Sequence, residues 1–310
     1  MPVPMIGYHS DAEISDDAER RRQKLAPKEQ IPQPTAAGAR DRSYLAAESD
    51  WVKFACTVRT DTDQLGVAPG YLKKEWNEGG KRCFRYVMDT PIRYFFTIVS
   101  ARYTKLEDTW TAPDGRKVAL QVLYHAPHKW NVDRMMAGMK AALAYCEANY
   151  TPYQYRQLRI LEFPAYAEFA QAFPNTVPYS EGIGFILDVD KDRRGMDTPY
   201  YVTAHETAHQ WWAHQVIGAD AAGSEMLSEA LADYTAGRIL SKKLPISGER
   251  RYLMQSVERY LRGRSSDRIG ENPLALCQHQ QYIHYSKGTL IFTALSRRVG
   301  EEKLNSIIAE

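Results

Sequence analysis

The chain has 310 residues, which at about 100 to 200 residues per domain indicates two domains and excludes a small disulfide-stapled protein. Apolar residues make up 44% and charged residues 25%, as in folded globular chains, so a disordered or collagen-like chain is excluded. Lysine and arginine total 40 and aspartate and glutamate total 38, so the formal net charge of +2 indicates no nucleic-acid or anionic-membrane partner.

The first part of the chain is predicted to be a polar lead-in followed by β structure. Residues 1–43 carry several prolines and a charged run at 15–22, which predicts a short helix within a solvated segment. Apolar residues then alternate from Val52 to Val58, the period of a half-buried strand. Further strands are predicted at 83–88, 94–101 and 118–124. We assign residues 44–108 to a β-rich domain, the end of an N-terminal β domain.

Residues 109–310 are predicted to form an α+β domain. Apolar residues at helical spacing, including Met135, Met136 and Met139, indicate a helix that begins after the cap Asn131, and this methionine stripe is interpreted as core packing. Strands are predicted at 158–163 and 184–189, and helices at about 200–217, 224–242, 247–262 and 285–299. The four cysteines form no Cys-x-x-Cys pair, so they are interpreted as small core residues.

No membrane-spanning segment is expected in this chain. Its apolar runs are far shorter than the roughly 18 residues that a transmembrane helix needs. The N-terminus also lacks the basic and apolar regions of a secretory signal peptide. These observations leave the cellular compartment open.

One short motif indicates metal chemistry. His205-Glu206-Thr207-Ala208-His209 places two imidazoles one helical turn apart, so both can bind one metal ion while Glu206 flanks the ion without binding it. With 8 histidines and 38 acidic residues, such a pattern is expected by chance about 0.03 times in a chain of this length. The motif therefore favours a zinc site over coincidence.

A catalytic zinc site needs a third protein ligand and an open fourth position. Glu229 follows His209 by twenty positions, in a segment with an apolar helical stripe, and is the preferred candidate. Glu225, one turn earlier on the same face, is the competing candidate. Asp233, one turn after Glu229, is placed to accept a hydrogen bond from a ligating imidazole and to fix its tautomer.

Four stretches, in this order along the chain, resemble the zinc metallopeptidases called gluzincins, in particular the membrane alanyl aminopeptidase family. Pro178–Gly184 falls where that family has Gly-x-Met-Glu-Asn, and His205–Trp212 is similar to its zinc helix. Ser228–Tyr234 is similar to its Asn-Glu-Gly-Phe-Ala segment, and Tyr285–Gly288 is similar to its Tyr-x-Lys-Gly. The likeness extends over most of residues 80–300.

This resemblance implies a thermolysin-like zinc peptidase domain that follows the β-rich domain and is truncated at the C-terminus. It implies one zinc ion per chain, held by His205, His209 and Glu229, and a peptide substrate. The expected activity is the removal of N-terminal residues from peptides. A bacterial subgroup in which such a domain is joined to an ABC transporter permease has very similar segments, which implies attachment of the full-length protein to a membrane permease.

The resemblance also implies roles for three further side chains. Glu206 is the expected general base, and Tyr285 the expected hydrogen-bond donor to the oxyanion. Glu181 is the expected carboxylate that binds the free α-amine of the substrate. The glycine and asparagine that flank this glutamate in the family are replaced here, which leaves exopeptidase specificity open.

Two alternatives to an aminopeptidase stay open. One is a thermolysin-like endopeptidase, in which Glu181 is a surface carboxylate. The other is a catalytically idle zinc-containing module that partners a membrane transporter. Glu206, Tyr285 and an open fourth zinc position favour an active enzyme, because a structural zinc site is closed by four protein ligands and needs neither side chain.

The remaining histidines are interpreted as structural. His125 and His128 have metal-ligand spacing but no matching acidic partner in the sequence, so a second metal there is not expected. His214 is predicted to lie at a polar helix end, too far around the helix from His209 to join the same metal.

Overall fold

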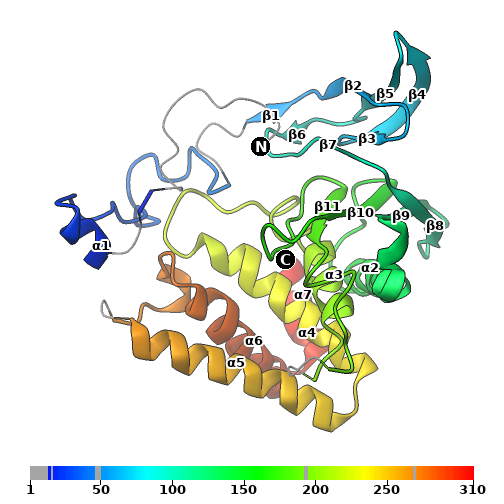
Figure 1. Ribbon diagram of the computed structural model, residues 1–310. Coiled ribbons are helices and arrows are strands. Elements are labelled where there is room, and N and C mark those ends of the chain that lie inside the picture. The colour runs from blue at the N-terminus through cyan, green and yellow to red at the C-terminus, as the bar shows by residue number, and fades with distance from the viewer. Residues whose placement is uncertain (1–12, 15–16, 46–49, 192–194, 268–269) are drawn as a thin grey trace.

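The computed structural model describes residues 13–14, 17–45, 50–191, 195–267 and 270–310 (Figure 1). Short strands form its upper part, a four-stranded sheet lies in the middle, and helices fill its lower part. The chain is therefore a mixed α and β structure, with most strands in its N-terminal half and most helices in its C-terminal half, as expected.

Seven short strands form the N-terminal β region: β1 (Trp51–Val52), β2 (Ala55–Thr60), β3 (Leu65–Val67), β4 (Tyr71–Glu78), β5 (Lys81–Val87), β6 (Ile92–Arg93) and β7 (Val99–Ala101). Strands β2, β5 and β4 form an antiparallel sheet, while β1 pairs with β6 and β3 with β7. The strand predicted at 94–101 is reduced to β7. The Phe95 ring packs on Phe173, whereas the ring of the adjacent Phe96 packs on Phe54. The side chains of Phe95 and Phe96 thus have different packing partners.

The central sheet has the order β11 (Thr176–Ser180), β10 (Gln157–Phe163), β9 (Lys117–Tyr124), β8 (Thr104–Thr111). Strands β9, β10 and β11 are parallel, and β8 is antiparallel to β9. Leu158 and Ile160 of β10 are buried, as expected of a central parallel strand. Strand β8 crosses the domain boundary expected at residues 108 and 109.

The strand predicted at 184–189 is absent from the described residues, and that prediction was wrong. This segment is a series of turns, and the neighbouring strand is β11. The side chain of Asn131 explains the difference, because its amide donates hydrogen bonds to the carbonyls of Gly184 at 2.7 Å and Leu187 at 2.8 Å. These carbonyls are thus satisfied without a sheet partner. Because the side chain of Asn131 is used in these two bonds, it makes no capping hydrogen bond to the helix that follows, contrary to the prediction.

Seven α-helices are described: α1 (Asp17–Arg22), α2 (Val132–Asn149), α3 (Thr198–Ala208), α4 (Leu231–Lys243), α5 (Ile246–Ser266), α6 (Gly288–Val299) and α7 (Glu301–Ala309). Helix α2 connects the parallel strands β9 and β10 and packs on α3, which in turn packs on α4. Met135 and Met139 are fully buried, which confirms the methionine stripe as core packing. Among the described residues, no helix combines the length and apolarity needed to cross a bilayer.

The N-terminal lead-in is partly packed, and the expectation of a wholly solvated segment was wrong. The N–H of Ile31 donates to Gln278 Oε1 at 2.8 Å, and the N–H of Ala222 donates to the carbonyl of Pro32 at 2.7 Å. Ser43 forms an isolated β-bridge with Ala219. Helix α1 confirms the short helix predicted in the charged run at 15–22, of which residues 15 and 16 lie outside the described residues.

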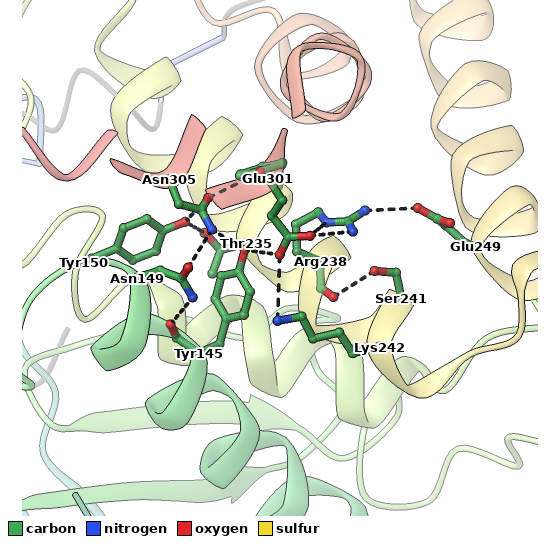
Figure 2. Close-up of polar contacts among 11 residues, drawn as sticks. Tyr145, Asn149, Tyr150, Thr235, Arg238, Ser241, Lys242, Glu249, Glu301 and Asn305 are labelled. Atoms are coloured by element: carbon green, nitrogen blue, oxygen red, sulfur yellow. Dashed lines mark hydrogen bonds and ion pairs between the residues drawn. The ribbon is translucent and has the colours of Figure 1, made fainter. Parts of the chain in front are cut away.

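Figure 2 shows the polar network that holds α7 against α2 and α4. The amide of Asn305 donates to the Tyr145 hydroxyl at 2.9 Å, and this hydroxyl donates to Glu301 at 2.9 Å. Arg238 of α4 reaches Glu301 at 2.7 Å and Glu249 of α5 at 3.0 Å. The network therefore ties the last helix to the helices that pack around α3.

Replacing Asn305 with alanine is expected to lower the free energy of unfolding by about 1 to 3 kcal/mol, because buried polar groups lose their partner. Asn305 is 1% exposed, and its amide also donates to Asn149 at 2.9 Å. Urea denaturation measures the change. Ser306→Ala, at the exposed neighbouring position, is the control and should shift stability by less than about 0.5 kcal/mol. Equal effects of the two substitutions would contradict the role of the network.

Candidate metal centre and active site

Helix α3 carries the His-Glu-x-x-His motif. Asp197 caps its N-terminus by accepting a hydrogen bond from the N–H of Tyr200 at 3.3 Å, and a proline lies in the first turn, where no N–H is required. The helix ends at Ala208, with His209 as its C-cap, which is earlier than the expected residue 217. Gln210 contributes to this early end, because its side chain bonds the carbonyl of Phe173 and the N–H of Asn175, both at 3.0 Å.

Three side chains converge where α3 faces the segment before α4. The Nε2 atoms of His205 and His209 are 3.0 Å apart, and Glu229 Oε2 lies 3.3 Å from each of them. Glu229 belongs to the π-helical segment Met226–Ala230, which runs directly into α4. The structure thus brings Glu229 to the two imidazoles, whereas Glu225 points to another group of side chains.

The outer nitrogen of each imidazole has its own acceptor. His209 Nδ1 lies 2.8 Å from the carbonyl of Trp212, and His205 Nδ1 lies 3.4 Å from Asp233 Oδ1. The other oxygen of Asp233 accepts a hydrogen bond from Thr289 at 2.5 Å. Burial acts to raise the pKa of Asp233, but the contact with His205 outweighs burial and holds the pKa below its usual value. These contacts place the protons on Nδ1 and leave both Nε2 lone pairs facing inward.

The donor set fits a zinc ion. Two imidazole nitrogens and a carboxylate oxygen are the ligands of many catalytic zinc sites, in which the fourth position stays open. Glu229 Oε2 is buried, yet it makes no hydrogen bond of acceptable geometry with any described residue. A buried carboxylate oxygen without a partner is costly, and a bound cation removes that cost.

Glu206 follows His205 on α3 and is 6% exposed. Burial raises the pKa of its carboxyl above the usual value, although the neighbouring imidazoles act in the opposite direction. The backbone of Ala172, in the segment that leads into β11, also acts to lower this pKa. A buried carboxylate with a raised pKa is suited to taking up a proton and releasing it again.

Tyr285 lies in a second π-helical segment, Tyr282–Lys287, which precedes α6. Its ring centroid is 6.0 Å from that of His205, and its hydroxyl lies near the Glu229 carboxylate. Burial raises the pKa of the hydroxyl far above its usual value, and the charge of Glu229 adds to this effect. Tyr285 therefore keeps its proton and can act as a hydrogen-bond donor beside the three metal-ligand candidates.

Glu181 follows β11 and lies in a different contact group. Its Oε1 accepts a hydrogen bond from the N–H of Ala165 at 3.0 Å, and its Oε2 lies 3.4 Å from His128 Nδ1. The same His128 nitrogen also contacts the buried carboxylate of Glu162. The expectation that His128 lacks an acidic partner was therefore wrong, because β10 and the turn after β11 bring two carboxylates to it.

The prediction that His214 lies at a polar helix end was wrong, and a further histidine, His284, is also buried. His214 is buried and lies beyond the end of α3, and its Nε2 lies 3.2 Å from the carbonyl of Ala172. Burial lowers the pKa of His214 to about 4. His284 is 2% exposed and lies 2.6 Å from Glu225 Oε2. Glu225, the alternative candidate for the third ligand, thus contacts His284 instead of His205 and His209.

Tyr44 is a residue of the site region that sequence reasoning missed. Burial raises the pKa of its hydroxyl far above the usual value, and the nearby charges of Glu229 and Glu225 add to the shift. Tyr44 follows Ser43, whose bridge to Ala219 brings the end of the lead-in to this place. No motif in the sequence marks Tyr44, because the contact depends on that long-range pairing.

The fold is that of solved zinc metallopeptidases. The crystal structure of an M1 zinc metallopeptidase from Deinococcus radiodurans matches with a TM-score of 0.63 at 16% identity, over 84% of this chain and 56% of that chain. The crystal structure of Legionella pneumophila aminopeptidase A in complex with aspartic acid matches with a TM-score of 0.63 at 17% identity, over 84% of this chain and 31% of that chain. This chain thus spans little more than half the length of the first protein. No protein-family model and no curated protein matches the sequence.

Proposed function

We propose that this chain hydrolyses peptide bonds with a zinc ion held by His205, His209 and Glu229. The convergence of their three donor atoms, with a buried Glu206 beside them, is the observation that carries the proposal. The likeness in fold to M1 zinc metallopeptidases supports it. When bound, zinc supplies Lewis acidity toward the scissile carbonyl and acidity to water.

The side chains of the chain itself supply the remaining steps. Glu206 accepts a proton from the attacking water and passes it to the leaving amine, which its raised pKa favours. Tyr285 keeps its phenolic proton and donates a hydrogen bond to the oxyanion as it forms. Asp233 holds the His205 ring in the orientation that directs Nε2 inward.

We further propose that the enzyme removes residues from the N-termini of peptides. The carboxylates of Glu162 and Glu181 both approach Nδ1 of His128, and the ligand atoms of these three side chains are within 4.8 Å of one another. Two carboxylates in one place favour a positively charged group of the substrate, such as its free α-amine. The strand predicted at 184–189 is replaced by turns, so the aminopeptidase proposal rests on Glu181 and its surroundings.

Glu181→Ala is expected to lower kcat/KM for peptides with a free N-terminus by about 10- to 100-fold, because a charge-assisted contact is lost. N-acetylated peptides should be poor substrates of both forms. Glu168→Ala, which removes an exposed carboxylate from the loop between β10 and β11, is the matched control and should leave kcat/KM unchanged. Cleavage rates on paired free and acetylated peptides measure both effects.

The same assay separates the alternatives. Equal internal cleavage of free and blocked peptides by the unmutated chain would replace the aminopeptidase with an endopeptidase. Zinc binding without cleavage of either peptide would indicate the idle module. Attachment of the full-length protein to a membrane permease stays a prediction from the sequence resemblance alone.

A further inference from the structure

A second group of metal-ligand side chains lies beside the proposed catalytic centre. It consists of Glu225, Cys277 and His284, whose ligand atoms are all within 4.8 Å of one another. Glu225 directly precedes the π-helical segment that carries Glu229, and His284 directly precedes Tyr285. Cys277 follows the short 3-10 helix Leu274–Leu276. Three separate segments therefore meet at this point.

Two of the three residues are buried and Glu225 is half-buried, and two polar atoms of the group lack ordinary partners. Cys277 is 1% exposed and His284 is 2% exposed. Glu225 Oε2 and His284 Nδ1 lie 2.6 Å apart, yet neither makes a hydrogen bond of acceptable geometry with any described residue. The nitrogen and the oxygen are close, but they are not aimed along the line that joins them.

The proposed catalytic site shares this feature, namely a buried polar atom that lies close to other polar atoms but makes no hydrogen bond with them. Glu229 Oε2 is 3.3 Å from both imidazole nitrogens, and it too makes no hydrogen bond of acceptable geometry within the described part of the chain. Donor atoms that face a common point are arranged as metal ligands are, whereas hydrogen-bonding groups are aimed at each other.

We propose that Glu225, Cys277 and His284 form a second binding site for a divalent, thiophilic cation such as Zn²⁺. A carboxylate, a thiolate and an imidazole are all zinc ligands. One carboxylate and one thiolate balance the two positive charges of the ion, so the buried group becomes neutral when the ion binds. The thiol proton of Cys277 leaves to solvent on binding. This ion would take no part in the chemistry of peptide hydrolysis.

The surroundings of Cys277 fit a reactive thiol less well than they fit a metal ligand. Burial raises the pKa of this thiol to about 11, and the charge of Glu225 adds to the shift. Reactive cysteines have lowered pKa values and positively charged neighbours. A nearby dication reverses the effect of the carboxylate and favours the thiolate.

The ion would fix the two segments that carry Glu229 and Tyr285. The loop of Cys277 already touches the loop before Glu225, because the N–H of Gly223 donates to the Cys277 carbonyl at 2.8 Å. This approach is so close that a Cβ atom on Gly223, which has a φ of +86°, would lie 2.0 Å from the carbonyl oxygen of Ala275. A metal ion at this place would join the loops and the π-helical segment through bonds stronger than packing.

Cobalt substitution tests the proposal on the whole chain. Co²⁺ bound by a thiolate gives a near-ultraviolet charge-transfer band, and the proposed catalytic site contains no cysteine. We expect the chelator-stripped, cobalt-loaded chain to show this band and to hold two ions. Cys277→Ser should remove the band and one ion. Cys56→Ser, in the half-buried position of β2, is the matched control and should keep both.

His205→Ala separates this proposal from the proposed function. This variant should lose the catalytic ion and keep the charge-transfer band. The experiment therefore tests the two proposed sites independently. Absence of the band from the unmutated chain at saturating cobalt would overturn the second site and leave Glu225 and His284 as an ion pair beside Tyr285. Persistence of the band in a folded Cys277→Ser variant would overturn the assignment of the thiolate.

Discussion

Replacing Glu206 with glutamine is expected to lower kcat by about 10²- to 10⁴-fold while the zinc content stays unchanged, because the substitution removes the general base and keeps the shape of the side chain. Glu206 lies beside His205 and is 6% exposed, and it is not one of the three residues whose ligand atoms converge at the proposed metal site. Peptide cleavage assays combined with metal analysis measure the two quantities together.

Glu229→Ala is the comparison for this experiment, because it removes a proposed ligand rather than the base. It should lose the catalytic zinc ion and the activity. If Glu206→Gln cleaves peptides at the unmutated rate, another group acts as the base. If the double variant of His205→Ala and Glu229→Ala binds as much zinc as the unmutated chain, the three residues do not form the site.

Replacing Tyr285 with phenylalanine is expected to lower kcat by about 10²- to 10³-fold with little change in KM, because an oxyanion donor acts mainly in the transition state. The hydroxyl contacts the Glu229 carboxylate and keeps its proton, so it is available as a donor. Steady-state kinetics on one unblocked peptide separate the two constants.

Tyr282→Phe is the matched control on the same π-helical segment. The Tyr282 hydroxyl donates to Asp267 at 2.6 Å, away from the imidazoles, so its removal should leave kcat unchanged. A similar loss of kcat in both variants would show that disturbance of the segment, rather than loss of an oxyanion donor, causes the effect. Zinc content should stay equal in the two variants.

The spacing of local motifs made part of the site predictable. His205 and His209 lie one helical turn apart, and that geometry belongs to the helix itself. The methionine stripe of α2 was likewise predictable, because Met135 and Met139 follow the helical period and are buried. Strands β9 and β10 were predictable from continuous or alternating apolar residues.

Other features depend on partners that are distant along the chain. The turns at 184–189 form because Asn131 binds two carbonyls there, a contact across more than fifty residues. His128 meets Glu162 and Glu181 only because β10 and β11 are adjacent parallel strands. No local periodicity carries such information.

The sequence by itself determined the His-Glu-x-x-His spacing, with Glu206 inside it, and the approximate positions of the main helices, since these follow from spacing within one helix. Only the tertiary structure decided which acidic residue joins which histidine: Glu229 faces His205 and His209, and Glu225 faces His284. Glu225 and Glu229 are one turn apart and chemically identical. Their different partners arise because α3 and the π-helical segment before α6 approach the same segment at different places.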